Sequence, residues 1–231
     1  MISRILRIRI SILTCALLPL ASGRANGQLD LHWDDQLAGP PGVDGSVFSL
    51  ELKEGELYVG GLFFTLDGGN VVATNIAKWT GDVWAALGGG VDGAVRAIVA
   101  TDTAVFVGGS FTHAGGVKVN GIAKWNGSEW SALGNGVDGE VYAIGVEDDR
   151  LYIGGSFTEA GGVTANRIAM WDGTSWSALG DGFNDVVRAI ELAGEELYVG
   201  GSFTSAGAVQ ANRIAKWDGS SWSAVGDGIP W

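Results

Sequence analysis

Residues 151–180 read LYIGGSFTEAGGVTANRIAMWDGTSWSALG, and this stretch decides the fold. Its start, Leu151 to Phe157, is rich in hydrophobic and aromatic residues and predicts a β-strand. After a polar loop, Arg167 to Trp171 predicts a second strand. The Asp172-Gly173 pair tolerates positive φ and marks a tight hairpin turn into a third strand, Trp176 to Leu179. The stretch therefore predicts a small antiparallel sheet.

The same pattern recurs along the chain at a nearly constant spacing. Trp79, Trp125, Trp171 and Trp217 follow one another at intervals of 46 residues. A further strand precedes each stretch, such as Val141 to Val146 in the third copy, so each copy holds four strands, called a, b, c and d. Four-stranded antiparallel units at this repeat length are typical of β-propeller blades. We therefore predict an all-β propeller with repeats at about 47–94, 95–140, 141–186 and 187–231.

The residues that recur in every copy are interpreted as architecture. Aromatic residues dominate burial in protein cores, so the recurring tryptophans are predicted to pack between blades. The glycine pairs, such as Gly154-Gly155, are predicted to mark close approach of strands where a side chain would clash. The first copy has two extra residues, which lie between Gly61 and Trp79.

The N-terminus differs in kind from the repeats. Arg4, Arg7 and Arg9 precede an apolar run from Ile10 to Ala21, and small residues follow it. This order is typical of a secretory signal peptide, and the run is shorter than the roughly 20 residues of a spanning helix. We predict a signal peptide at residues 1–25 and a chain that is secreted to the extracellular space or cell surface, with no membrane insertion after cleavage.

The composition sets limits on stability and partners. Cys15, the only cysteine, lies within the predicted signal peptide, so the mature chain has no disulfide and depends on packing. The net charge of −12 becomes 10 − 26 = −16 when the four basic residues of that peptide are removed. Nucleic acid is excluded as a partner, because phosphate binding needs clustered Lys and Arg.

The repeats resemble kelch-like β-propeller repeats, of the type found in large secreted bacterial proteins and in fungal cell-polarity markers. The signature of those repeats runs GGxFTxAGG, NxIAxWDG and WxxLG, which Gly154–Gly162, Asn166–Gly173 and Trp176–Gly180 fit. The resemblance covers about Val47 to Gly228 and implies a propeller fold. It implies no single activity, because kelch-like propellers include binders, scaffolds and enzymes.

Two classes of propeller enzyme can be compared with this sequence through the residues that their activity requires. Kelch-like copper oxidases need a Tyr/His metal set and a modified cysteine, whereas the mature chain has only His32 and His113 and no cysteine. Sialidase propellers need an arginine cluster, whereas the arginines here are scattered. No Ser/His/Asp or Cys/His set can be assembled, because each needs a histidine beside its nucleophile. We therefore predict no catalytic residues and no cofactor.

Candidate binding residues are sought where the repeat breaks on the face formed by the b–c and d–a loops. The candidates there are His113, Glu159, Asn166, Arg167, Asn212 and Arg213. Asp92 and Asp138 lie in Val-Asp-Gly turns of the same face. Turn chemistry is the favoured interpretation of these carboxylates, and a Ca²⁺ site is the alternative.

The predicted function is a non-enzymatic binding, adhesion or scaffold propeller with an extracellular protein or glycan partner. One alternative is a glycan-active hydrolase or lyase with two loop carboxylates about 5–9.5 Å apart. Another is a structural segment of a larger surface array.

Closure of the ring is a separate question. Leu31 to Leu37 resembles a strand d, so one extra N-terminal outer strand is predicted beside the four repeats. Four closed blades, a fragment of a larger ring and combined protomers all stay open. Exposed blade edges would allow self-association, because unpaired edges invite pairing with another chain.

Overall fold

The computed structural model describes residues 42–230. These residues belong to the second of two units of the chain, Gly39–Trp231. The predicted signal peptide and the predicted outer strand at Leu31–Leu37 lie outside the described residues.

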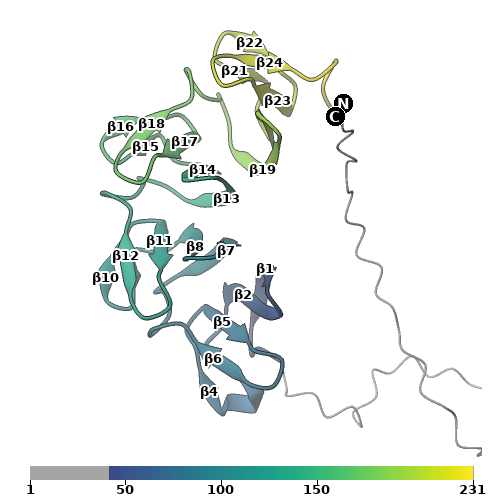
Figure 1. Cartoon of the computed structure of the whole chain (residues 1–231). Helices are drawn as coiled ribbons and strands as arrows, with labels where there is room; N and C mark the ends of the chain where they lie inside the picture. Colours follow the sequence, from purple (N-terminus) through teal and green to yellow (C-terminus); the bar gives the residue numbers. More distant parts are fainter. Residues whose placement is uncertain (1–41, 231) are drawn as a thin grey trace, which may run out of the picture. The chain divides into compact units, whose positions relative to one another are not determined.

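Four antiparallel sheets of four strands each follow one another along the chain (Figure 1). In each sheet the strands pair in sequence order as a meander, which confirms the predicted blades. Blade 1 holds β1 (Ser46–Lys53), β2 (Glu56–Leu62), β5 (Ile76–Trp79) and β6 (Trp84–Ala86). Blade 2 holds β7 (Ala94–Ala100), β8 (Val105–Ser110), β11 (Ile122–Trp125) and β12 (Trp130–Ala132). Blade 3 holds β13 (Val141–Glu147), β14 (Arg150–Gly155), β17 (Ile168–Trp171) and β18 (Trp176–Ala178). Blade 4 holds β19 (Val187–Ala193), β20 (Glu196–Gly201), β23 (Ile214–Trp217) and β24 (Trp222–Ala224).

The b–c loop of each blade contains a small hairpin that the sequence pattern did not predict. Each of its two strands has only two residues, which is too short for a hydrophobic alternation to show. In blade 1 a 3₁₀ turn, η1 (Asp67–Gly69), joins the two strands and lies in the segment with the two extra residues. The hairpins are β3 (Thr65–Leu66) with β4 (Val71–Val72), β9 (His113–Ala114) with β10 (Val117–Lys118), β15 (Glu159–Ala160) with β16 (Val163–Thr164), and β21 (Ser205–Ala206) with β22 (Val209–Gln210).

The glycine pairs bring strands together as predicted. A Cβ atom on Gly154 would overlap the side chain of Val187 in the next blade. A Cβ atom on Gly155 would overlap the carbonyl oxygen of Glu140, the residue just before strand β13 of the same blade. The first glycine of the pair therefore admits a valine of the following blade, and the second admits the backbone of strand a.

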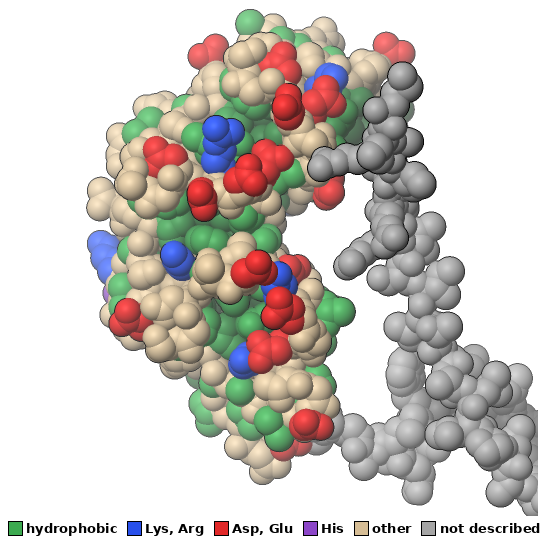
Figure 2. Space-filling model, viewed as in Figure 1, with side chains coloured by type: hydrophobic (Ala, Val, Ile, Leu, Met, Phe, Trp, Pro, Cys, Tyr) green, Lys and Arg blue, Asp and Glu red, His purple; other side chains and the backbone are tan. Residues whose placement is uncertain are grey.

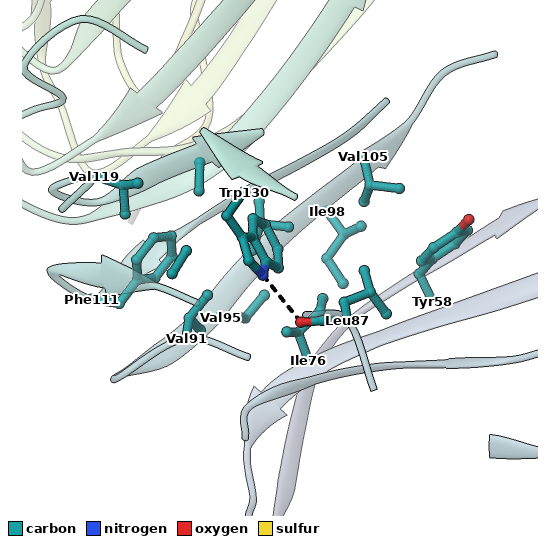
Figure 3. Close-up of a cluster of buried hydrophobic side chains, with 13 residues drawn as sticks. Tyr58, Ile76, Leu87, Val91, Val95, Ile98, Val105, Phe111, Val119 and Trp130 are labelled. Atoms are coloured by element: carbon teal, nitrogen blue, oxygen red, sulfur yellow. Dashed lines mark hydrogen bonds between the residues drawn. The ribbon is translucent and has the colours of Figure 1, made fainter. Parts of the chain in front are cut away.

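The hydrophobic clusters lie where one blade meets the next. Figure 3 shows the first of them, in which Tyr58 and Ile76 of blade 1 pack with Val95, Ile98 and Trp130 of blade 2. Trp125, one of the recurring tryptophans, is half-buried against this cluster, and its strand d neighbour Trp130 is 5% exposed, so the predicted packing between blades is confirmed here. Among the described residues, no helix is both long and apolar enough to cross a membrane.

Candidate functional site

The carboxylates of the d–a turns hold the outer hairpins in place. Asp138 Oδ1 accepts hydrogen bonds from the amides of Thr158 (2.7 Å) and Glu159 (2.8 Å), and its Oδ2 accepts one from Thr158 Oγ1 (2.6 Å). Asp92 makes the same set of bonds in blade 2. In blade 4 the neutral Asn184 takes the same place. These side chains are therefore part of the turn architecture.

Hydrogen bonding keeps these carboxylates ionised. Partial burial raises the pKa of Asp138, but the hydroxyl of Thr158 and the amides around it outweigh burial and lower the pKa overall. At the c–d turn of blade 3, the amides of Ser175 and Thr174 lower the pKa of Asp172. A general acid at neutral pH needs the opposite displacement, a raised pKa. These carboxylates thus suit a structural role.

His113 and Glu159, both predicted site residues, lie on the exposed outer hairpins of blades 2 and 3. The backbone amide of each donates to the turn aspartate of its own blade, Asp92 or Asp138. His113 Nδ1 lies 2.8 Å from Thr112 Oγ1 and 3.1 Å from Asp92 Oδ2. The two side chains reach solvent from separate blades.

The predicted site residues Asn166 and Asn212 tie each b–c loop to the following d–a turn. Asn166 Nδ2 donates to the carbonyl oxygen of Asp181 (2.9 Å), and Asn212 Nδ2 donates to that of Asp227 (3.3 Å). Asn120 in blade 2 makes the same bond. The bond recurs in three blades, so it contributes to architecture in each of them.

Arg167 and Arg213 adopt left-handed backbone, with φ of 64° and 65°. The same position holds Gly121 in blade 2 and Asn75 in blade 1, two residue types that tolerate this conformation. An arginine there carries backbone strain, which tends to persist where function requires it. The Arg213 guanidinium donates to the carbonyl oxygen of Ile229.

The structure separates the predicted site residues into different cavities. Asn166 and Arg167 line a cavity of about 470 Å³ with Ser205 of blade 4. His113 lines another, of about 350 Å³, with Asp92. The binding role predicted for these residues stays a prediction.

A cavity of about 660 Å³ opens between blades 2 and 3 at the a–b and c–d turns, the face that sequence reasoning did not consider. Its lining includes Asp102, Phe106, Lys124, Arg150, Trp171 and Asp172. Aromatic, basic and acidic side chains thus share one pocket.

This cavity coincides with a break in the repeat. In blade 1, Glu56 accepts hydrogen bonds from Tyr58 Oη (2.8 Å) and Lys78 Nζ (2.6 Å). In blade 4, Glu196 does the same with its own tyrosine and lysine.

Blades 2 and 3 lack this Glu–Tyr–Lys triad. Blade 2 has Ala104 and Phe106 in place of the glutamate and tyrosine, which leaves Lys124 without an ion pair among the described residues. Lys124 Nζ lies 6.0 Å from the centre of the Phe106 ring instead. Blade 3 has Arg150 and Met170 in place of the glutamate and lysine. Aligning the repeats column by column could have identified this break.

Metal-binding side chains do not gather in the described part of the chain. Within residues 42–230, no group of three or more His, Cys, Asp or Glu side chains lies in an arrangement that could hold a metal ion.

The four-stranded blades and their packing define a β-propeller protein. The chain belongs to the family of the Rax2 C-terminal β-propeller domain, which matches residues 71–230. No curated protein matches the sequence at a significant level.

Three solved structures match part of the chain at low sequence identity. The computationally designed Ika8 protein shows 14% identity and a TM-score of 0.48, with 78% of this chain and 61% of that chain covered. The computationally designed Ika4 protein shows 15% identity and a TM-score of 0.46, with 78% and 96% covered. The β-propeller domain of the Trilobed protease from Pyrococcus furiosus shows 15% identity and a TM-score of 0.48, with 76% and 53% covered. The chain thus spans less than two thirds of the first and third of these structures.

Proposed function

We propose that the chain is an extracellular, non-enzymatic binding scaffold whose ligand occupies the cavity between blades 2 and 3. One observation carries this proposal: the Glu–Tyr–Lys triad of blades 1 and 4 is replaced in the two blades that form the cavity. A residue that departs from the repeat is not needed for the architecture that every blade shares. The extracellular location rests on the predicted signal peptide.

The side chains of this cavity favour a glycan as the ligand. Phe106 and Trp171 are half-buried and offer apolar ring surface to a sugar ring. Asp148, Asp149 and Asp172 are exposed at the rim, where side-chain oxygens can accept hydrogen bonds from the hydroxyl groups of a sugar. Acidic side chains are spread over this surface, with fewer basic ones between them (Figure 2). A neutral sugar therefore fits better than an anionic one, and the Lys124 ammonium can donate hydrogen bonds to its hydroxyl groups.

The test is a glycan-binding screen on the purified chain, with and without Ca²⁺, followed by calorimetry on any hit. Lys124→Ala should weaken binding at least tenfold. Lys216→Ala is the matched control, because it changes the same column of the repeat in blade 4, outside the cavity. The control should leave the affinity unchanged.

Three outcomes would contradict the proposal. If Lys124→Ala and Lys216→Ala bind alike, the cavity is not the site. If only a protein partner binds, the glycan assignment is wrong. If the bound glycan is cleaved, the enzymatic alternative replaces a binding role.

A further inference from the structure

Strand β1 of blade 1 exposes two side chains whose equivalents in blades 2 and 3 are buried. Val47 and Leu50 of β1 are 41% and 61% exposed. The strand pairing places Val47 opposite Gly61 and Val95 opposite Gly109, so these two valines occupy equivalent positions. In blade 2, Val95 is 0% exposed and Ile98, which is equivalent to Leu50, is 5% exposed. Within residues 42–230, nothing covers this hydrophobic face of blade 1, which is made by Val47, Leu50 and Leu52.

Blade 4 presents the complementary face. In the first three blades, the first glycine of the pair admits a valine of the following blade, as Gly154 admits Val187. A Cβ atom on Gly200 would meet only ordinary contacts, with Ala189 Cβ at 3.7 Å and the Arg213 carbonyl oxygen at 3.8 Å. Ile214 is half-buried, whereas the equivalent Ile168 is fully buried. The space beside Gly200, called the socket below, is therefore open, because no described valine fills it.

The inner strands also carry a ladder of cations and aromatic rings. The Arg96 guanidinium lies 5.0 Å from the Phe48 ring centre and 5.6 Å from that of Tyr142. The Arg188 guanidinium lies 5.8 Å from the Tyr142 ring on the other side. These four residues are equivalent in their blades and alternate Phe, Arg, Tyr, Arg. Phe48 ends the ladder in blade 1, and Arg188 ends it in blade 4.

A hydrogen-bond donor in blade 1 and an acceptor in blade 4 lack the bond that joins neighbouring blades elsewhere. In blades 2 to 4, the strand d tryptophan donates to a carbonyl oxygen before the preceding d–a turn, as Trp130 does to Leu87 (3.1 Å). The buried Nε1 of Trp84 in blade 1 has no acceptor within the described part of the chain. Leu87 O accepts both this bond and one from the Gly90 amide, whereas the equivalent Val225 O accepts one described bond, from Gly228.

We propose that the open face of blade 4 binds blade 1 of a second copy of the chain, head to tail. Val47 and Leu50 of the second copy fill the socket at Gly200, and its Phe48 ring stacks on Arg188. Each arginine of the ladder then lies between two aromatic rings, an arrangement that favours cation–π attraction. Trp84 Nε1 of the second copy donates to Val225 O.

Two such contacts close a ring of eight blades from two copies. Propellers typically have four to eight blades, and three copies would give twelve. Each contact joins two different faces of the chain, so the ring closes with two copies only when the rotation per blade allows it. One local adjustment follows. Ile229 of one copy and Val43 of the other would compete for the same place at the proposed contact. The Ile229 amide donates to Asn212 O, and Val43 pairs with Leu66, at equivalent positions of a linker between blades. The exposed Ile229 therefore moves aside.

The experiment measures mass by sedimentation velocity and light scattering over a concentration series. The wild-type chain should form dimers. Leu50→Lys on blade 1 and Gly200→Val on blade 4 should each give monomers with unchanged circular dichroism. Val72→Lys is the matched control, because Val72 is 69% exposed on the outer hairpin and blade 2 already has Lys118 at that position. It should dimerise like the wild type.

Mixing the two monomeric variants tests the direction of the interface. Leu50 of the Gly200→Val copy can still meet Gly200 of the Leu50→Lys copy, so the mixture should form a one-to-one complex through one intact contact. A wild-type chain that stays monomeric at every concentration overturns the proposal. Dimers of Gly200→Val would also overturn it, because they would show an interface that does not use blade 4.

Discussion

Trp176 Nε1 donates a hydrogen bond of 2.8 Å to the carbonyl oxygen of Leu133, which lies 43 residues earlier in the chain. The bond runs from strand d of blade 3 to the start of the linker that leads out of blade 2. Blade 4 repeats it with Trp222 and Leu179. Blades 2, 3 and 4 are each thereby fastened to the end of the blade before them, through a tryptophan side chain that also fills the space between the two blades.

Replacing Trp176 with Phe should destabilise the chain by about 1–3 kcal/mol, because it removes a buried hydrogen bond and part of a well-packed ring. Trp84→Phe removes the same number of atoms, but the Trp84 N–H has no acceptor among the described residues. Its cost should be smaller by about 1 kcal/mol, the usual contribution of one hydrogen bond. Urea unfolding of both variants in the monomeric Leu50→Lys background checks this. Equal losses would show that the hydrogen bond contributes nothing.

Acid should weaken the hairpin attachment made by Asp138. Its pKa is lowered in the folded chain, so the unfolded carboxyl, with a pKa of about 3.9, binds a proton more readily. The stabilisation is therefore fully present above this unfolded pKa and is lost as the pH falls below it. Asp138→Asn should keep the attachment at neutral pH, as Asn184 does in blade 4, and should reduce the loss of stability in acid. Unfolding between about pH 5 and pH 2 measures this window. An unchanged pH dependence in the variant would contradict it.

The effect on stability of replacing the first glycine of a pair with alanine should depend on the blade. Gly154→Ala places a methyl group against Val187 and should cost about 1–3 kcal/mol, as overpacking does. Gly200→Ala places it in open space and should be neutral or stabilise the monomer by about 0.4–1 kcal/mol, because it restricts the unfolded chain. Thermal unfolding in the Leu50→Lys background compares the two. Similar losses at both positions would mean that the strand itself, and not the next blade, requires glycine.

The left-handed Arg167 offers a test between architecture and function. Arg167→Gly should leave stability unchanged or raise it by up to about 1 kcal/mol, because glycine adopts this backbone without strain. Lys118→Gly, in an ordinary strand, should instead lose about 0.5–1 kcal/mol. If Arg167→Gly also weakens ligand binding while the fold gains stability, the loop-face prediction is supported over the cavity between blades 2 and 3. A large loss of stability would show that the arginine is structural.

The sequence predicted the blades because their determinants recur at a fixed period. Local structure is indicated by residues such as Trp176, Gly154 and the Asp172-Gly173 pair. Because this pattern recurs in every copy, the local predictions together predict the propeller fold. The small hairpins were missed because two-residue strands such as Glu159–Ala160 leave no periodic trace.

The cavity and the blade 4 socket depend on contacts between blades, which a single repeat does not encode. Gly200 looks like Gly154 in the sequence, and the two differ in whether a described valine packs against them: Val187 contacts Gly154, and none contacts Gly200. The cavity was missed for a different reason. Its distinguishing residues, Phe106 and Arg150 among them, differ from one blade to the next, and the predicted binding residues lie on the opposite face.

The linkers between blades have a further consequence for folding. The Val91 amide donates to Thr74 O of blade 1, while Val91 pairs with Ala114 of blade 2 and Asp92 holds the hairpin of that same blade. Each linker thus belongs to two cooperative units at once, and coupling extends only to nearest neighbours. In the monomeric Leu50→Lys variant, amide hydrogen exchange should therefore be slowest in blades 2 and 3, with fraying that proceeds inward one blade at a time from blades 1 and 4.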